Sequence, residues 1–351
     1  MPKVFITGAT GYIGGDALYT IANTYPDLEF TALVRNSDKG AKVASQYPKI
    51  KLVYGELDRF DLLTTEAAKA DIVLHTANAG NLEAVNALIA GLAQKKTPGY
   101  LIHTSGTGTL GTPDFLNNTL GSHSDKMYDD WDGIGEVAST PESWGARKVE
   151  KAILTASSKN PGNIFTAIVA PPLIYGEGRG PDNQRSIQVP NMVKATLERG
   201  KGFYLGEGKN VWHVVHVQDL SDVFLRLVTS ALQAGGGKAT WNETGYYFTE
   251  TGDVVWGEIS NAIAKAAVER NLIANTELDS LTGDEANEIL PPYGAYIWGT
   301  NSKAKGIRAS RLLNWKPEKE GLFDTIDDAV IIEARALGLA KSHQEVAAGQ
   351  V

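Results

Sequence analysis

The sequence predicts an α/β fold: a doubly wound parallel sheet with helices on both faces, and a smaller α/β lobe toward the C-terminus. Two observations carry this prediction. A short apolar run at residues 4–6 leads directly into Gly8, Gly11 and Gly14. Apolar strand-like runs then alternate with amphipathic helical stretches. Sheets of this kind bind ligands at the carboxyl ends of their strands.

The first fourteen residues predict a strand, a glycine turn and the start of a helix. Gly8 permits the tight turn, Gly11 lets the backbone approach a pyrophosphate, and Gly14 lets the helix pack closely on the strand. The helix N-terminus offers free N–H groups to phosphates. A plain structural turn is the alternative, but the position behind an N-terminal strand favours a Rossmann-type dinucleotide site. Its predicted residues are Thr7, Gly8, Thr10, Gly11, Tyr12, Ile13 and Gly14.

Composition excludes several classes of protein. The 351 residues suggest one large two-lobed domain or two domains, and 33 basic against 41 acidic residues give a net charge of −8. This charge argues against nucleic acid or a membrane as partner. The absence of cysteine excludes disulfides and thiolate catalysis. With no signal-type leader and no bilayer-length apolar segment, we expect a cytoplasmic protein.

The segment after the second predicted strand bears on the choice of nucleotide. Further strands are predicted at residues 28–34, 50–54, 71–75, 100–103 and 164–169. An acidic residue at the end of the second strand would accept a hydrogen bond from the 2′-hydroxyl of NAD. Arg35 stands there instead, with Lys39 nearby, and a guanidinium suits a 2′-phosphate. We therefore predict NADP(H) rather than NAD; a solvated surface arginine is the alternative.

The ends of the third and fourth strands supply further candidates. Asp58 is either the N-cap of the next helix or the carboxylate that holds the adenine amino group, and both roles can coexist. Leu57 lies beside it. The small side chains of Thr76, Ala77 and Asn78 would let a cofactor lie against the backbone.

With these motifs the chain resembles the extended short-chain dehydrogenases/reductases of the NAD-dependent epimerase/dehydratase group, which includes nucleotide-sugar epimerases and dihydroflavonol-reductase-like enzymes. The resemblance rests on the turn at residues 7–14, Asp58, the Ser/Thr-rich end of the fifth strand, and segments 170–176, 213–220 and 313–317. It covers nearly the whole chain. It further implies that Pro171, Leu173 and Ile174 close on the nicotinamide carboxamide.

The resemblance also implies a catalytic set: a Ser or Thr that orients the substrate oxygen, a Tyr that exchanges the proton, and a Lys four residues later. Ser105 and Thr107 are the hydroxyl candidates, and Lys148 is the candidate for binding the nicotinamide ribose. Lys148 lies in a helix that we expect to begin at Pro141, and four residues before it stands Trp144. Its indole does not titrate at useful pH, so Trp144 cannot be the acid or base.

Several residues could replace the missing tyrosine. Tyr128 and His123 lie in a long segment, residues 111–141, that we expect over the nicotinamide end. Lys148 or a water molecule is another proton donor, and absence of redox chemistry is the fourth possibility. A surface lysine at Lys148 and a solvated acidic loop at 111–141 are the non-catalytic alternatives.

The rest of the chain predicts the smaller lobe and no metal site. His213 and His216 point to opposite faces of a strand, and no carboxylate has zinc-like spacing. Helices are expected at about 187–199, 253–268, 278–290 and 322–337, with a frayed tail at 344–351. We assign residues 1–176 and about 211–240 to the NADP-binding domain. Residues of about 177–210 and 241–351 form the substrate lobe.

The sequence therefore predicts an NADP(H)-dependent oxidoreductase of the carbonyl reductase or alcohol dehydrogenase type, with a small-molecule carbonyl compound or alcohol as substrate. The alternatives are an NADP(H)-binding regulator that senses redox state, and a non-redox isomerase or cyclase that retains the nucleotide. The oligomeric state is open; the family resemblance implies a homodimer that pairs the helices near Leu82 and Trp144. Five basic residues are candidates for holding a substrate diphosphate, with surface solvation as the alternative for each: Arg185, Lys194, Arg199, Arg308 and Arg311.

Overall fold

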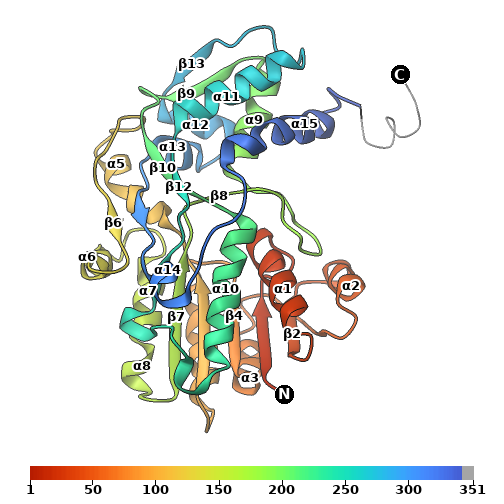
Figure 1. The fold of residues 1–351 in the computed structure, drawn as a ribbon, viewed down its shortest axis with the longest axis vertical. Helices are drawn as coiled ribbons and strands as arrows, with labels where there is room; N and C mark the ends of the chain where they lie inside the picture. Colours follow the sequence, from red (N-terminus) through yellow and green to blue (C-terminus); the bar gives the residue numbers. More distant parts are fainter. Residues whose placement is uncertain (342–351) are drawn as a thin grey trace.

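The computed structural model describes residues 1–341 and consists of a large parallel sheet with a smaller lobe at its carboxyl edge (Figure 1). Seven strands lie in the order β11-β7-β5-β4-β1-β2-β3, and all neighbours are parallel. They are β1 (Lys3–Thr7), β2 (Glu29–Val34), β3 (Lys51–Tyr54), β4 (Ile72–His75), β5 (Gly99–Thr104), β7 (Ile164–Ala170) and β11 (Tyr246–Phe248). The strand order reverses between β1 and β4, which is where doubly wound sheets bind ligands.

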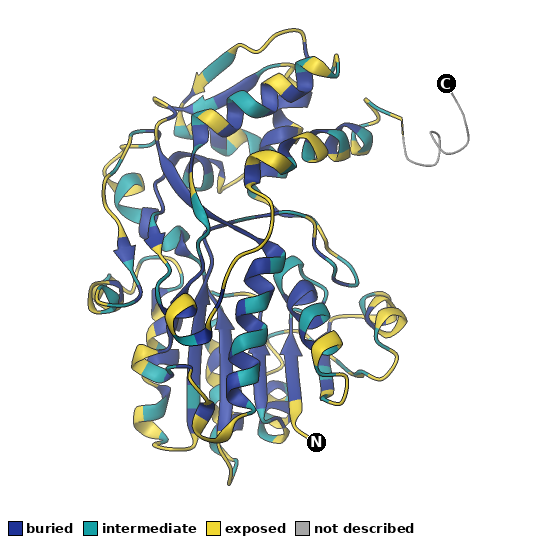
Figure 2. Cartoon of the chain, in the orientation of Figure 1, coloured by how far each residue is buried: buried dark blue, intermediate teal, exposed yellow. Residues whose placement is uncertain are grey.

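Helices cover both faces of this sheet, so the predicted α/β class is confirmed (Figure 1). One face carries α1 (Tyr12–Thr24) and α10 (Val217–Ala231), and the other carries α3 (Phe60–Lys69), α4 (Leu82–Ala93) and α7 (Arg147–Leu154), while α2 (Ser37–Gln46) follows β2. Val4 and Ile6 face the first layer, and Phe5 faces the second. Because both faces are covered, the strands are largely buried (Figure 2).

The smaller lobe has its own apolar core, in which Trp256 and Trp298 are fully buried. It contains β9 (Gly202–Leu205), β13 (Leu278–Leu281), α9 (Gln188–Arg199), α11 (Trp256–Glu269), α12 (Gly283–Ile289), α13 (Gly294–Gly299) and α15 (Ile326–Ala336). A second sheet of β8 (Leu173–Tyr175), β10 (Val211–His216) and β12 (Gly252–Val255) lies between this lobe and the large sheet (Figure 1). The chain therefore crosses between the two parts several times.

The segment that follows β5 is anchored to the C-terminal part of the chain. It contains α5 (Thr112–Leu116), β6 (Tyr128–Asp129) and α6 (Ile134–Ser139), and β6 pairs with β14 (Ala304–Lys305). The buried Asp130 carboxylate accepts hydrogen bonds from the backbone N–H groups of Phe248, Ile307 and Arg308 at 2.8–3.0 Å. The remaining short helices are α8 (Ala156–Lys159) and α14 (Arg308–Leu313).

Two predicted elements differ from the structure. The helix expected at 278–290 begins as strand β13, which pairs with β9, and turns helical only after Thr282, whose side chain forms a capping box with Glu285. The helix expected from Pro141 begins at Arg147, after a series of turns. The tail expected at 344–351 lies outside the described residues. Within residues 1–341, no helix has the length and apolar character needed to cross a membrane.

Candidate functional site

The glycine turn between β1 and α1 has no room for a side chain at Gly8 or Gly14. Gly8 has a φ of +87°, and a Cβ there would lie 2.7 Å from the Thr76 carbonyl group. A Cβ on Gly14 would overlap the Thr76 hydroxyl and the Gly8 carbonyl oxygen. At Gly11 a Cβ would meet the Gly8 oxygen at 3.2 Å and otherwise open space. Gly11 therefore leaves its side of the turn accessible to a ligand.

A cavity of about 510 Å³ opens in front of this turn, and we call it the turn cavity. Ten predicted cofactor residues line it: Thr7, Gly8, Thr10, Gly11, Arg35, Lys39, Leu57, Thr76, Ala77 and Asn78. Five lining residues were missed, namely Leu33, Val34, Gly55, Glu56 and Asn183. Four of these adjoin the strand ends already predicted. Asn183 lies far along the chain, and no sequence signal indicated it.

Several predicted cofactor residues lie beside the turn cavity without lining it. Tyr12 donates a hydrogen bond to the Gly176 carbonyl oxygen at 2.5 Å, and burial raises its pKa. Ile13 packs against the core under α1. Asp58 is exposed, and helix α3 has Arg59 as its N-cap residue with no side-chain capping bond, so the capping role predicted for Asp58 is wrong. Its predicted role at the adenine stays a prediction.

The segment after β7 lies beside the residues that follow β5. The Pro171 carbonyl oxygen accepts a hydrogen bond from the Thr107 N–H at 2.9 Å. Leu173 is fully buried in the core of the smaller lobe, and Ile174 is half-buried against the core on the α1 side. A contact of these residues with a nicotinamide stays a prediction.

Two histidines are buried in the sheet below the turn. His75 Nδ1 and Thr7 Oγ1 share a hydrogen bond of 2.6 Å, and the rings of His75 and His103 stack with 5.1 Å between centroids. Burial lowers the pKa of His75 to about 4, and burial together with the neighbouring His75 lowers that of His103. Both imidazole rings are therefore uncharged at pH 7, and they pack against each other inside the sheet.

The two candidate hydroxyls after β5 have different partners. Ser105 donates a hydrogen bond to Glu150 Oε1. Thr107 is fully buried, and its hydroxyl lies 2.7 Å from the Ser302 hydroxyl, which also donates to the Thr107 carbonyl oxygen. Ser105 therefore contacts an ionisable group, whereas the Thr107 hydroxyl contacts the Ser302 side chain.

Glu150 is the centre of a buried polar cluster that sequence reasoning missed. Its carboxylate accepts hydrogen bonds from Ser105, from the Tyr246 hydroxyl at 2.9 Å and from the Arg147 guanidinium, with which it forms an ion pair. Glu150 is fully buried and Arg147 is 3% exposed. Burial raises the pKa of Tyr246 to about 12, so its phenol stays protonated and donates. Three donors therefore surround one buried carboxylate.

A signal for Glu150 exists in the sequence, although it was not recognised. Glu150 is flanked by Val149, Ile153 and Leu154, which face the core from the same helix. An acidic residue on the apolar face of a helix needs a buried partner. Arg147, three residues earlier, is at the spacing that provides one.

The other catalytic candidates lie away from this cluster. Lys148 is exposed, and its charge acts on Glu142, which pairs with Lys151 on the outer side of α7. Tyr128 is buried in β6 with the Lys126 ammonium 4.7 Å from its ring centroid. His123 is half exposed and pairs with Asp125 at 3.0 Å.

Among the described residues, no group of three His, Asp or Glu side chains is arranged to hold a metal ion. The turn cavity can accept a phosphate-containing ligand, and Ser105 with Glu150 can exchange a proton at the carboxyl end of β5. Fold and site together define a two-lobed α/β protein with a Rossmann-type, doubly wound parallel sheet.

The family model described as "NAD dependent epimerase/dehydratase family" matches residues 4–242. The chain belongs to this family. It is 40% identical to the protein called oxidase ucsJ of an Acremonium species over 346 residues, which cover 96% of this chain and 99% of that protein. An uncharacterised protein of Saccharomyces cerevisiae, YLL056C, is 27% identical and covers 92% of this chain and 97% of its own length.

Solved structures share the fold at lower identity. The PbgP3 protein of Burkholderia pseudomallei superposes with a TM-score of 0.68 at 15% identity, over 95% of this chain and 96% of that one. The dTDP-glucose 4,6-dehydratase DesIV of Streptomyces venezuelae, solved with NAD and TYD bound, gives a TM-score of 0.65 at 17% identity, over 95% and 97%.

Proposed function

We propose that this protein is an NADP(H)-dependent oxidoreductase that interconverts a carbonyl compound and an alcohol, with Ser105 and Glu150 exchanging the substrate proton. The single observation that carries this proposal is the hydrogen bond from Ser105 to the buried Glu150 carboxylate, on the ligand side of the sheet. The name of the relative ucsJ, an oxidase, agrees with redox chemistry.

The cofactor part of the proposal rests on the turn cavity. Gly8 and Gly14 leave no space for a Cβ, and Gly11 opens onto the cavity, as a pyrophosphate cradle requires. The structural neighbour DesIV was solved with NAD in a related fold. Arg35 lines the cavity at the end of β2 and supports a 2′-phosphate. When bound, the nicotinamide supplies or takes up the hydride.

The proposed route of the proton follows from how far Ser105 and Glu150 are buried. Glu150 is fully buried, so the substrate touches Ser105, which is 8% exposed. In alcohol oxidation Ser105 accepts the substrate hydroxyl proton while its own proton passes to Glu150. In carbonyl reduction both transfers run in reverse. Tyr246 and Arg147 hold the carboxylate in place and stabilise its charge.

The substrate proposed is uncharged. The cations considered for a substrate diphosphate are engaged: Arg185 with Glu333, Lys194 with Glu198, Arg199 with Asp279, Arg308 with the Asp130 carbonyl oxygen, and Arg311 with the Trp131 ring. A diphosphate would have to break such contacts. This supports a carbonyl compound or alcohol without phosphate groups.

The test is a nucleotide titration followed by turnover on the same sample. Protein fluorescence is recorded with NADPH and NADH, and nicotinamide absorbance is then followed with a panel of aldehydes, ketones and alcohols. Binding with turnover is the expected result. Tight binding without turnover on any compound favours the regulator, and product formation without net NADPH consumption favours the isomerase. Failure of both nucleotides to bind contradicts the proposal.

A further inference from the structure

A loop from the smaller lobe crosses onto the nucleotide side of the large sheet. Residues 176–187, between β8 and α9, lie against α1 and α2, and we call them the strap (Figure 1). Asn183 belongs to the strap and lines the turn cavity, and its N–H donates to the Thr10 carbonyl oxygen at 3.3 Å. A ligand that fills the cavity therefore meets the strap.

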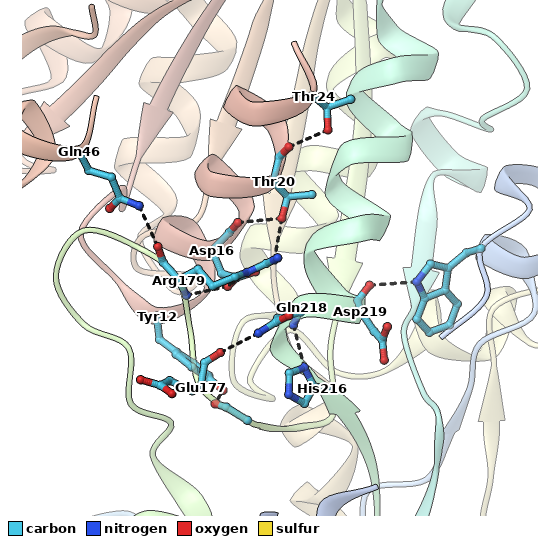
Figure 3. A network of polar contacts seen from close by, with 12 residues as sticks. Tyr12, Asp16, Thr20, Thr24, Gln46, Glu177, Arg179, His216, Gln218 and Asp219 are labelled. Atoms are coloured by element: carbon cyan, nitrogen blue, oxygen red, sulfur yellow. Dashed lines mark hydrogen bonds and ion pairs between the residues drawn. The ribbon is translucent and has the colours of Figure 1, made fainter. Parts of the chain in front are cut away.

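The first anchor of the strap is on α1. Arg179 donates to both carboxylate oxygens of the fully buried Asp16, at 2.7 and 3.0 Å, and its N–H donates to the same carboxylate at 2.8 Å (Figure 3). Gln46 at the end of α2 donates to the Arg179 carbonyl oxygen at 3.0 Å. Gly180 lies so close to Gly15 that a Cβ on Gly180 would be 2.6 Å from the Gly15 Cα. None of the charged groups of this anchor lines the turn cavity.

The second anchor is on α2 and borders the turn cavity. Asp182 forms ion pairs with both Lys39 and Lys42, and its side chain is 9% exposed. Burial acts to raise the pKa of Asp182, but the two ammonium groups outweigh it and hold the pKa below its usual range. Lys39 lines the turn cavity together with Arg35. One strap carboxylate thus pairs with two lysines of α2.

We propose that the Asp182 carboxylate and the 2′-phosphate of NADP(H) compete for Lys39 and Lys42. Binding of NADP(H) then releases the second anchor of the strap, whereas NAD(H) leaves it closed. This rests on the proposed nucleotide site. The physical reason is that Lys39 both pairs with Asp182 and lines the turn cavity beside Arg35. A phosphate bound at these two cations would repel the nearby Asp182 carboxylate and compete with it for the same ammonium group.

The competition makes Asp182 a determinant of cofactor choice. In Asp182→Asn both lysines are free for the phosphate, so we expect NADP(H) to bind about tenfold more tightly while NAD(H) binding stays unchanged. Lys39→Met should weaken NADP(H) alone. In the variant that combines Asp182→Asn with Lys39→Met, the gain in NADP(H) affinity should be lost, because the Lys39 ammonium group is absent.

Two controls separate charge from strap closure. Glu177→Gln removes the same charge from an exposed strap residue that makes no ion pair with Lys39 or Lys42. We expect it to leave the ratio of NADP(H) to NAD(H) affinity unchanged. Arg179→Met releases the first anchor and leaves both lysines paired with Asp182, so it should change both affinities alike.

The experiment measures dissociation constants for NADPH and NADH by protein fluorescence in the full chain, and hydrogen exchange of the strap backbone with each nucleotide. Faster exchange at residues 181–185 with NADPH than with NADH, and a shifted affinity ratio in Asp182→Asn, support the competition. If both nucleotides bind and the ratio does not move, the competition is wrong while the proposed function stands. If neither nucleotide binds the unchanged protein, both are wrong.

Discussion

At the scale of single residues, the contact between Ser105 and Glu150 decides the proposed chemistry. The phenol expected from the family resemblance is absent at Trp144. The carboxylate of Glu150, in the helix that follows Trp144, accepts a hydrogen bond from the predicted Ser105 instead. A buried carboxylate next to a hydroxyl can accept a proton, whereas an indole cannot.

Ser105→Ala and Glu150→Gln should each lower kcat by about 10²–10⁴-fold, the range for loss of a positioned acid or base. Nucleotide affinity should stay unchanged, because neither side chain lines the turn cavity. Steady-state kinetics and fluorescence titration measure the two effects. Thermal melts show whether Glu150→Gln, which leaves Arg147 without its ion pair, still folds. Wild-type kcat in Ser105→Ala would contradict the proposed role.

Lys151→Met is the matched control for this pair of variants. Lys151 lies on the same helix, is exposed and pairs with Glu142 at the surface. We expect unchanged kcat and a free energy of unfolding within about 0.5 kcal/mol of the original.

His75 makes stability depend on pH. Its pKa is about 4 in the folded protein, against 6.5 as the ordinary value, so below pH 6.5 unfolding takes up a proton. The free energy of unfolding therefore falls as pH drops from 6.5 to 4. At pH 5 the loss caused by His75, relative to neutral pH, is about 2 kcal/mol. Asp130 acts in the opposite direction, because burial raises its pKa to about 6.

Urea denaturation of the wild type and His75→Gln at pH 7.5 and 5 isolates this contribution. The loss of stability between the two pH values should be about 2 kcal/mol smaller in His75→Gln. The exposed His123→Asn should behave as the wild type. Equal pH dependence in the wild type and His75→Gln would disprove the assignment.

At the scale of elements, the junction of β1 and α1 is the most constrained. The Gly14 position packs α1 directly against the Gly8 carbonyl group and Thr76. The adjoining strap adds a contact of Gly180 with Gly15 on the same helix. These approaches depend on glycine because any Cβ would push the helix away from the strand.

Gly14→Ala should reduce the free energy of unfolding by about 1–3 kcal/mol through overpacking and weaken nucleotide binding. Chemical denaturation and fluorescence titration check both effects. Gly135→Ala is the matched control, since this glycine lies in α6 with nothing within 4 Å of an added Cβ. It should be neutral or stabilise by about 0.5–1 kcal/mol. Equal stability of the two variants would show that α1 can shift without cost.

At the scale of the whole molecule, the parts are joined by buried polar groups as well as by apolar packing. Asp130 connects the insertion after β5 to β11 of the large sheet and to the start of α14. The strap connects the smaller lobe to α1 and α2 through two charged anchors. Both links bring together residues more than 100 positions apart.

Asp130→Ala should lower the free energy of unfolding by about 3 kcal/mol, because it removes the acceptor for three backbone N–H groups and opens a buried site. The exposed Asp132→Asn should change stability by less than about 0.5 kcal/mol. Thermal and urea unfolding provide the comparison. A melting temperature of Asp130→Ala equal to that of Asp132→Asn would rule out the connecting role.

Patterns within the sequence were enough to predict the fold class, the family and most residues of the turn cavity. These depend on local patterns: alternation of apolar runs, and glycines where the backbone turns. Gly8, Gly11 and the ends of β2 and β4 could therefore be predicted, because neighbours in sequence are also neighbours in the site. Strand β13 was missed because its partner β9 lies some 70 positions earlier.

The proposed catalytic pair and the ion pairs of Lys39 and Lys42 could be recognised only in the folded structure. Glu150 meets Ser105 and Tyr246 across separations of 45 and 96 residues. Asp182 reaches Lys39 across 143. Such pairs leave no periodic trace in the sequence, since a buried charge is specified by the partner that the fold brings to it. The proposed cofactor choice and the proposed proton transfer therefore both depend on contacts between residues that are distant in sequence.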